Sequence, residues 1–409
     1  MSAAPSPLVA AARGRPADDP IFALHQEAVR RAAAGESILN ATLGTLSGEG
    51  GEIAVLPCVL ETLDRVQGKS TAGYAPVAGS PAFLAATIAD LFGDGPLARQ
   101  AVAAATPGGT GAVYQAVMNF LEPGQKLVTT SYHWGPYSSI ARNNGRDAET
   151  FTMFAQNGTL DVDGLAAVLD RHVDTQGRAL VVLNDPCHNP TGYSLRPNEW
   201  RRVADVIREA GARAPVTVLL DIAYFRFGGA SATTWVDAVP TLLETTTVLV
   251  AWTASKTFTQ YGARVGAVVA LHRDEQERSQ IKNALAFTCR STWSNCNHLG
   301  QDAFTELMTV PQLRRRADAE RQELIALLGR RIDAFNAAAG AVGLRTPRFE
   351  SGFFSMVFTP DGERTAARMR DLGVYVLPLK GAVRVGLCST PVADISRLVD
   401  ALKQGVGAA

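Results

Sequence analysis

The chain has 409 residues, which is too long for one compact core, so we expect two domains. Its 39 basic residues balance its 39 acidic ones, so the chain has no net charge that would steer it toward nucleic acid or an anionic membrane surface. The composition, 46% hydrophobic and 19% charged, is ordinary for a globular protein, and no apolar stretch reaches membrane-spanning length.

The N-terminus is rich in alanine and proline and lacks the apolar segment of a signal peptide. We therefore expect a flexible arm over residues 1–18. The cysteines are odd in number and scattered, with neither metal-ligand spacing nor a disulfide pattern: Cys58, Cys187, Cys289, Cys296 and Cys388. This usage favours the reducing cytoplasm and predicts no metal site.

A glycine-rich segment, Gly-Gly-Thr-Gly at residues 108–111, precedes an apolar helical pattern over residues 112–121. Glycines before a helix let backbone N–H groups bind a phosphate at the positive end of the helix dipole. The segment matches neither a Walker A sequence nor the dinucleotide fingerprint. Trp134 follows; a single tryptophan usually packs in a core, but it could also stack on a flat ring.

Short apolar runs in the middle of the chain indicate strands at residues 179–183, 216–220, 248–251 and 265–270. They lack alternation, as do strands buried on both faces, and helical patterns such as residues 197–210 separate them. This order predicts the α/β class with a mainly parallel sheet. Because ligands bind at the carboxyl ends of such strands, we expect Asn184, Asp221 and the segment before Lys256 to converge on one crevice.

Lys256 lies in the sequence Thr-Ala-Ser-Lys-Thr-Phe, directly after an apolar run that ends at Trp252. Burial at the end of a strand lowers the pKa of a lysine, and a neutral amine forms a Schiff base with an aldehyde. Ser255 and Arg264 carry groups suited to a phosphate. Together these residues suggest pyridoxal phosphate bound covalently to Lys256.

Two motifs upstream of Lys256 each allow two interpretations. Asn-Pro-Thr-Gly at residues 189–192 is either a proline turn or a way to fix Asn189 as a donor to a ring oxygen. Asp221 is either a helix N-cap or a carboxylate beside a pyridine nitrogen, which would keep that nitrogen protonated. In the second case Tyr224, three residues later, could bond to the ring hydroxyl.

The pattern changes near residue 310. A long amphipathic helix is predicted over residues 313–339, followed by strand candidates at 353–358, 374–378 and 383–387 and a helix at 391–405. We interpret this part as a smaller α+β domain. Arg384, inside the last strand candidate, either faces water or forms a fork for a carboxylate, and Arg290 has the same two interpretations.

Taken together, these motifs resemble those of the class I aminotransferases, pyridoxal phosphate enzymes of fold type I, and most of all their aspartate and aromatic subgroup. The resemblance runs from about Asp19 to the C-terminus and includes Asp-Pro-Ile-Phe at residues 19–22 and Tyr-Ala-Pro-Val-Ala-Gly at residues 74–79. We expect a segment over residues 19–55 that joins the small domain, a large cofactor-binding domain over residues 56–310 and a small domain over residues 311–409.

The resemblance implies a role for each matching position. Lys256 is similar to the Schiff-base lysine, Asp221 to the partner of the pyridine nitrogen, and Asn189 and Tyr224 to the donors to the ring hydroxyl. Trp134 matches the tryptophan that stacks on the ring. Phosphate contacts are implied for Gly108, Gly109, Thr110, Ser255 and Arg264, and for Tyr74 supplied from a neighbouring subunit.

Three further positions are implied to bind substrate. Arg384 resembles the clamp for the α-carboxylate, although extra residues around 380–382 make this match local, and Gly44 matches a glycine whose loop closes over substrate. Arg290 resembles an arginine that grips a distal carboxylate across a dimer interface. The resemblance thus implies a homodimer with shared active sites.

The chain also departs from the subgroup around the expected site. Asn184 and Tyr137 stand where histidines are usual, and Leu46 replaces a tyrosine. Cys-Asn-His at residues 296–298 replaces a pair of prolines. These changes spare the catalytic set but alter its surroundings, so they bear on substrate choice.

The expected activity is ping-pong transfer of an amino group between a dicarboxylic or aromatic L-amino acid and a 2-oxo acid. Lys256 would be the base and Asp221 would keep the cofactor ring cationic. The alternatives are a lyase or decarboxylase on the same scaffold, a regulator that only binds the cofactor, and coincidental motifs. Both candidate carboxylate arginines favour transamination, and the neutral charge offers no footprint for DNA.

Overall fold

The computed structural model describes residues 7–9, 12–15, 20–68 and 70–407. The flexible arm expected over residues 1–18 lies mostly outside these residues, as does Asp19 of the Asp-Pro-Ile-Phe sequence, so both stay predictions. Within the described residues, every helix is too short or too polar to cross a membrane.

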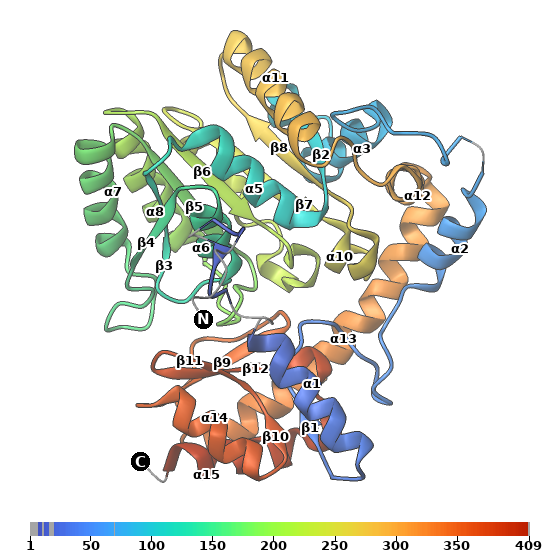
Figure 1. The fold of residues 1–409 in the computed structure, drawn as a ribbon, viewed down its shortest axis with the longest axis vertical. Helices are drawn as coiled ribbons and strands as arrows, with labels where there is room; N and C mark the ends of the chain where they lie inside the picture. The colour runs from blue at the N-terminus through green and yellow to red at the C-terminus, as the bar shows by residue number, and fades with distance from the viewer. Residues whose placement is uncertain (1–6, 10–11, 16–19, 69, 408–409) are drawn as a thin grey trace.

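A seven-stranded sheet forms the upper part of the molecule in Figure 1. Six strands are parallel to one another and β8 is antiparallel to both its neighbours, which confirms the α/β class with a mainly parallel sheet. In spatial order the strands are β2 (Ala101–Thr106), β8 (Gly266–Leu271), β7 (Thr247–Thr253), β6 (Val216–Asp221), β5 (Ala179–Asn184), β3 (Lys126–Thr130) and β4 (Asp147–Phe151).

Both faces of this sheet are buried, which explains the continuous apolar runs. In β7, Leu249 and Ala251 join the core beneath α5, whereas Val248, Val250 and Trp252 join the core beneath α8. The first face is covered by α5 (Gly108–Phe120), α6 (Pro136–Asn143) and α11 (Glu275–Thr292). The second is covered mainly by α3 (Pro81–Phe92), α7 (Val162–Gln176), α8 (Pro197–Gly211) and α12 (His298–Thr309).

The register of the sheet brings polar strand ends together. Asn184 is the last residue of β5 and pairs with Asp221, the last residue of β6, which in turn pairs with Ala251 of β7. The chain leaves β7 directly into α10 (Ala254–Thr257), which carries Lys256. Three neighbouring strands therefore deliver these side chains to one edge of the sheet, as the apolar runs predicted.

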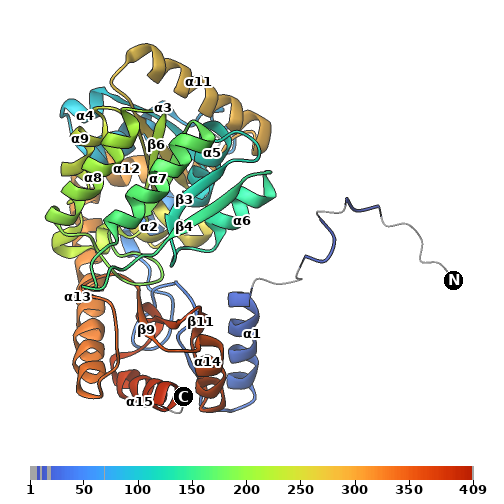
Figure 2. The same ribbon diagram turned by 90° about the vertical axis from the view of Figure 1, so that its left-hand side faces the viewer.

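A second, smaller sheet lies below the first and has its own hydrophobic core (Figures 1 and 2). Its strands are antiparallel and lie in the order β11 (Leu377–Leu379), β12 (Ala382–Gly386) and β9 (Phe354–Phe358). It packs with α14 (Gly362–Asp371) and α15 (Ile395–Gly407), while α13 (Pro311–Ala341) runs from the upper part down its side.

The N-terminal segment reaches this lower part. After α1 (Pro20–Ala33), strand β1 (Leu39–Asn40) pairs in parallel with β10 (Val374–Tyr375). The remaining helices are α2 (Pro57–Arg65), α4 (Pro96–Arg99) and α9 (Val239–Leu242).

Some expected boundaries differ from the observed ones. The strand expected at residues 374–378 is divided into β10 and β11, which belong to different sheets. The helix expected from residue 391 begins at Ile395, after a 3₁₀ turn. Helix α5 already includes Gly108, so the glycines form its first turn instead of preceding it. Asp221 ends a strand and is no helix N-cap.

Candidate active site

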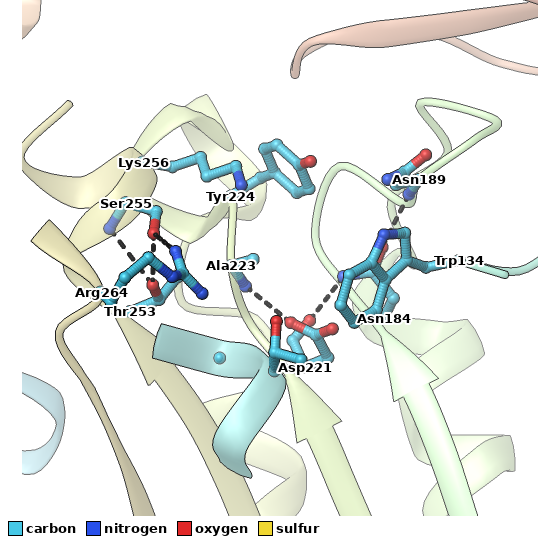
Figure 3. Close-up of a pocket in the computed structure, with 12 residues that line it drawn as sticks. Trp134, Asn184, Asn189, Asp221, Ala223, Tyr224, Thr253, Ser255, Lys256 and Arg264 are labelled. Carbon is cyan, nitrogen blue, oxygen red and sulfur yellow. Dashed lines mark hydrogen bonds between the residues drawn. The ribbon is translucent and has the colours of Figure 1, made fainter. Parts of the chain in front are cut away.

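One cavity opens at the carboxyl ends of β5, β6 and β7 (Figure 3). Most residues that the sequence singled out for cofactor binding line it. They are Gly109, Thr110, Trp134, Asn189, Asp221, Tyr224, Ser255, Lys256 and Arg264, and they are joined by Asn184, Ala223 and Thr253.

Lys256 extends into this cavity from α10 (Figure 3). The helix starts because the Thr253 side chain accepts a hydrogen bond from the Ser255 N–H at 3.2 Å. The Lys256 Nζ lies 5.5 Å from the ring centroids of both Tyr224 and Tyr261. Burial lowers the pKa of Lys256 to about 8, although the negative charge of Asp221 opposes this shift. A neutral amine is therefore accessible near physiological pH.

Asp221 lies on the floor of the cavity with both carboxylate oxygens bonded. One accepts a hydrogen bond from the Tyr137 hydroxyl at 2.6 Å, and the other from the Ala223 N–H at 3.2 Å. Burial raises the pKa of Asp221, whereas these two donors and Lys256 act in the opposite direction. The carboxylate is thus held in one orientation beside a potential cationic partner.

Asn184 connects two of the predicted residues. Its amide donates to the Asp221 carbonyl at 2.7 Å, and its side-chain oxygen accepts from the Asn189 N–H at 2.6 Å. The Asn-Pro-Thr-Gly motif thereby stays close to β6. The motif requires glycine at its last position, because Gly192 has a φ of 72° and a Cβ there would lie 2.2 Å from the Phe354 carbonyl oxygen.

One end of the cavity has the features of an anion site. Gly109 and Thr110 lie in the first turn of α5, where backbone N–H groups are unpaired and the helix dipole is positive. Opposite them, Arg264 donates to the Ser255 hydroxyl at 3.3 Å and to the Pro107 carbonyl at 3.1 Å. Gly108 belongs to this end too, since a Cβ there would lie 2.5 Å from the Arg264 guanidinium.

Two aromatic rings flank the remaining space. The Tyr224 ring is buried against Phe353, with ring centroids 5.1 Å apart, and burial raises the pKa of its hydroxyl. Trp134 is half-buried and lies edge-on to Tyr137 at 5.5 Å. Both rings line the cavity, which makes them available to a flat ligand.

Two of the residues predicted to bind substrate lie next to the cavity. Arg384 is buried in β12 and donates to the Asn189 side-chain oxygen at 3.2 Å and to the Thr42 carbonyl at 2.5 Å. Its guanidinium lies 4.2 Å from the Phe354 ring centroid. Gly44 approaches the same ring, because a Cβ there would lie 2.7 Å from the Phe354 Cζ.

Two other predicted residues are not brought to the cavity. Tyr74 is 91% exposed, and Arg290 is an exposed residue of α11 that donates to the Ser294 hydroxyl at 2.7 Å. Within the described part of this single chain, neither lines the pocket that contains Lys256.

The sequence reasoning missed Thr253, Ala223 and the hydrogen bond of Tyr137. Thr253 carries a detectable signal, since threonine before a short helix is a common N-cap. Ala223 contributes through its backbone N–H, which its side chain does not reveal. Tyr137 lies far from Asp221 along the chain, so only the packing of α6 against the sheet brings the two together.

The residues present fit pyridoxal phosphate. The cavity combines a lysine with a lowered pKa, a buried carboxylate and an anion site built from Ser255, Arg264 and the start of α5. A Cβ added at Gly108 would overlap the Arg264 guanidinium, and a Cβ added at Gly266 would overlap the Gly108 backbone. Only glycine therefore fits at these two positions. The cavity thus offers a partner for each functional group of the cofactor: Lys256 for the aldehyde, Asp221 for the pyridine nitrogen and the anion site for the phosphate.

The comparisons with known proteins agree with this chemistry. The family model described as "Aminotransferase class I and II" matches residues 36–402. An aromatic-amino-acid aminotransferase from Paracoccus denitrificans is 31% identical over 252 residues, which span 60% of this chain and 61% of that relative. The chain thus aligns with less than two thirds of that relative's length.

Solved structures extend the likeness to nearly the whole chain. The structure of an aminotransferase from Anaerococcus prevotii superposes with a TM-score of 0.90 and 28% identity over 98% of this chain and 99% of that one. An aromatic-amino-acid aminotransferase from Burkholderia pseudomallei, covalently bound to pyridoxal phosphate, shares the fold with a TM-score of 0.79 at 23% identity over 98% and 100% of the two chains. The expected fold type I is confirmed.

Proposed function

Since the chain belongs to the aminotransferase class I and II family, we propose that it moves an amino group between an L-amino acid and a 2-oxo acid by a ping-pong mechanism, with pyridoxal phosphate as cofactor. One observation carries the proposal most. Lys256, with its pKa lowered to about 8, shares a cavity with the buried carboxylate of Asp221 and with the residues of the anion site, Ser255, Arg264 and the first turn of α5. When bound, pyridoxal phosphate supplies an electron sink for negative charge at the substrate α-carbon.

Each side chain of the cavity has a separate role in the proposed reaction. Lys256 anchors the cofactor and, once its amine is free, accepts the α-proton of the substrate at Nζ. Asp221 would hold the ring nitrogen of the cofactor through its carboxylate and keep a proton there. Asn189 and Tyr224 would donate to the ring hydroxyl, and Trp134 would offer its flat face to the ring. The contacts of Arg264 and Ser255, together with the first turn of α5, support their role in phosphate binding.

The substrate that we propose is a dicarboxylic or aromatic L-amino acid. Arg384 would bind the α-carboxylate through its guanidinium fork, and its stacking on Phe354 supports a fixed orientation. Arg290 would bind a distal carboxylate when one is present. The aromatic alternative is supported by the relative from Paracoccus denitrificans, which is an aromatic-amino-acid aminotransferase.

We further propose a homodimer with shared active sites. Tyr74 and Arg290 are exposed in the single chain, and other apolar side chains near Tyr74 in sequence are exposed as well: Ile53, Val55, Leu60 and Val77. An interface over this region would cover these side chains and let Tyr74 and Arg290 reach the cavity of the other subunit. Sedimentation of the purified protein tests the dimer directly.

The domain division and the cellular compartment remain proposals. Separate hydrophobic cores for the two sheets support a large domain over residues 56–310 and a small domain over residues 311–409, which residues 19–55 join. All five cysteines lie within the described residues as buried free thiols, which supports the cytoplasm.

A panel of amino donors assayed with 2-oxoglutarate tests the activity. We expect continued consumption of the amino donor only when the oxo acid is present, because a ping-pong transfer stops after one amino group per active site unless an acceptor removes it. A lyase or decarboxylase would release product without any oxo acid, and this result would overturn the proposal. Borohydride reduction followed by peptide mapping tests the anchor, and label at any position other than 256 would contradict it.

A further inference from the structure

The Tyr137 side chain forms a contact that the proposed mechanism does not use. Its hydroxyl donates to one oxygen of Asp221 at 2.6 Å, a short charge-assisted hydrogen bond, while the other oxygen accepts from the Ala223 N–H. Tyr137 and Asp221 come from α6 and β6, and both are buried. A buried phenol this close to a carboxylate is a fixed donor to it.

The Tyr137 ring is itself held on two sides. His133 stacks on it with a centroid distance of 6.3 Å and an interplanar angle of 11°, and Trp134 meets it edge-on at 5.5 Å. His133 is fixed in turn, because one ring nitrogen bonds to the Thr130 carbonyl and the other to the Ser138 hydroxyl, both at 3.0 Å. The phenol therefore cannot turn away from Asp221 without disturbing a packed cluster.

We propose that Tyr137 is a positioning residue, whose hydroxyl keeps the Asp221 carboxylate ionised and oriented toward the cavity. The inference rests on the role proposed above for Asp221 as the partner of the cofactor nitrogen. Tyr137 touches neither substrate nor cofactor in this assignment and acts only through the carboxylate.

The charges around the pair are consistent with this role. Burial raises the pKa of Tyr137 well above its ordinary value, so the phenol keeps its proton and remains a donor. Burial also raises the pKa of Asp221, and Tyr137 is the strongest of the groups that oppose this, ahead of the Ala223 N–H and Lys256. Of the other groups nearby, Arg264 lowers and Cys388 raises the pKa of Lys256, and Tyr224 raises the pKa of Tyr137. Loss of the phenol would thus leave a more basic carboxylate.

Replacement of Tyr137 by phenylalanine, Tyr137→Phe, tests the proposal in the full-length holoenzyme. Its matched control is Tyr193→Phe, because Tyr193 is equally buried and donates its hydroxyl to Glu199 outside this cavity. Loss of one hydrogen bond to a charged group predicts roughly tenfold to hundredfold weaker retention of pyridoxal phosphate in equilibrium dialysis for Tyr137→Phe. The Tyr193→Phe variant should retain the cofactor as the unchanged protein does.

A spectroscopic measurement distinguishes positioning from a purely structural role. A more basic Asp221 carboxylate would draw the proton that it shares with the ring nitrogen toward itself. The ring would then carry less positive charge. The Lys256 nitrogen that is joined to the cofactor would therefore keep its own proton to higher pH. We expect the pH midpoint of the colour change of the bound cofactor to rise by about one unit in Tyr137→Phe. An unchanged midpoint would overturn the proposal. If the phenylalanine variant does not fold, Tyr137→Leu takes its place in each comparison.

A double-mutant cycle shows whether Tyr137 acts through Asp221. In the Asp221→Ala background, the additional change Tyr137→Phe should weaken cofactor retention no further, because the acceptor of the hydrogen bond is gone. A full tenfold or larger loss in that background would overturn the proposal. Failure of the proposed function has a different signature, since Asp221→Ala alone would then leave retention and colour change unaltered.

Discussion

Arg384 and Asn189 are hydrogen-bonded to each other although they belong to different sheets. The Arg384 guanidinium, on β12 of the small sheet, donates to the Asn189 side-chain oxygen, which follows β5 of the large sheet. The same guanidinium donates to the Thr42 carbonyl and stacks on Phe354. The proposed carboxylate clamp is therefore tied to a proposed cofactor contact and to the N-terminal segment at once.

This geometry predicts that Arg384→Lys is not a conservative change. Lysine keeps the charge but loses the planar fork and the stacking on Phe354. We expect kcat/KM to fall by roughly 10²- to 10³-fold for every amino donor, since two charge-assisted hydrogen bonds to the α-carboxylate are affected. Steady-state kinetics with several donors measures this.

The control for this change is Arg345→Lys. Arg345 also lies over a phenylalanine, with its guanidinium 5.9 Å from the Phe358 ring centroid, but it is exposed and outside the cavity. Its replacement should leave kcat/KM unchanged. A loss confined to one donor in Arg384→Lys would contradict a role in binding the carboxylate that all donors share.

The sequence predicted the frame of the site because that frame follows from local patterns. Buried apolar runs locate β5, β6 and β7, and their parallel order brings Asn184, Asp221 and the start of α10 together. Contacts between distant segments were not predictable in this way. No pattern in the chain shows that α6 packs with the Tyr137 hydroxyl against Asp221.

The substrate residues were harder to predict for another reason. Arg384 reaches the site only through packing of the small sheet against the large one, and its bonds to Asn189 and Thr42 join three separate parts of the chain. Tyr74 and Arg290 lie outside the cavity of the single chain, so their roles depend on a second subunit. Their assignment comes from the resemblance alone and stays a prediction.

Replacement of Lys256 by alanine should abolish turnover. The change removes both the covalent anchor and the proposed base, and a general base alone contributes about 10²- to 10⁴-fold to a rate. We expect at least a 10⁴-fold loss in transamination, measured with a coupled oxo-acid assay, together with loss of borohydride-fixed cofactor. Undiminished transamination by the purified variant would refute the assignment of Lys256.

Asp221→Ala should separate cofactor binding from proton exchange. Without the carboxylate, the ring nitrogen is not kept protonated and negative charge at the α-carbon is poorly stabilised. We expect the variant to bind pyridoxal phosphate at elevated concentration but to exchange the α-proton of an amino donor roughly 10²-fold or more slowly in deuterated water. Exchange at the original rate would contradict the proposed role.

Arg290→Ala distinguishes the two substrate classes. If Arg290 binds a distal carboxylate in the dimer, its loss removes a charge-assisted contact for aspartate and glutamate but not for phenylalanine or tyrosine. We expect kcat/KM to fall by about tenfold to hundredfold for the dicarboxylic donors only. Equal effects on both substrate classes would show that Arg290 does not distinguish donors by their side chains. Arg278→Ala, on the same helix α11, is the control.

The lowered pKa of Lys256 also predicts how the stability of the protein without bound cofactor depends on pH. Its pKa falls from 10.5 to about 8 on folding, so below pH 8 the folded state holds a buried ammonium that the unfolded state keeps in water. Between pH 8 and 10.5 the unfolded state binds more protons at this residue, and stability therefore rises with pH. A shift of about 2.5 units corresponds to at most about 3 kcal/mol.

Replacing this lysine with methionine, Lys256→Met, removes the charge and preserves much of the volume. We expect the variant prepared without cofactor to be more stable than the unchanged protein by up to about 3 kcal/mol at pH 7, with the difference vanishing toward pH 10.5. Urea unfolding of both proteins across this range measures the difference, in which contributions from other titrating groups largely cancel. Lys403→Met, at an exposed position of α15, should show no such pH-dependent gain. A variant less stable than the unchanged protein at pH 7 would mean that the attraction between Lys256 and Asp221 outweighs the cost of burying the ammonium.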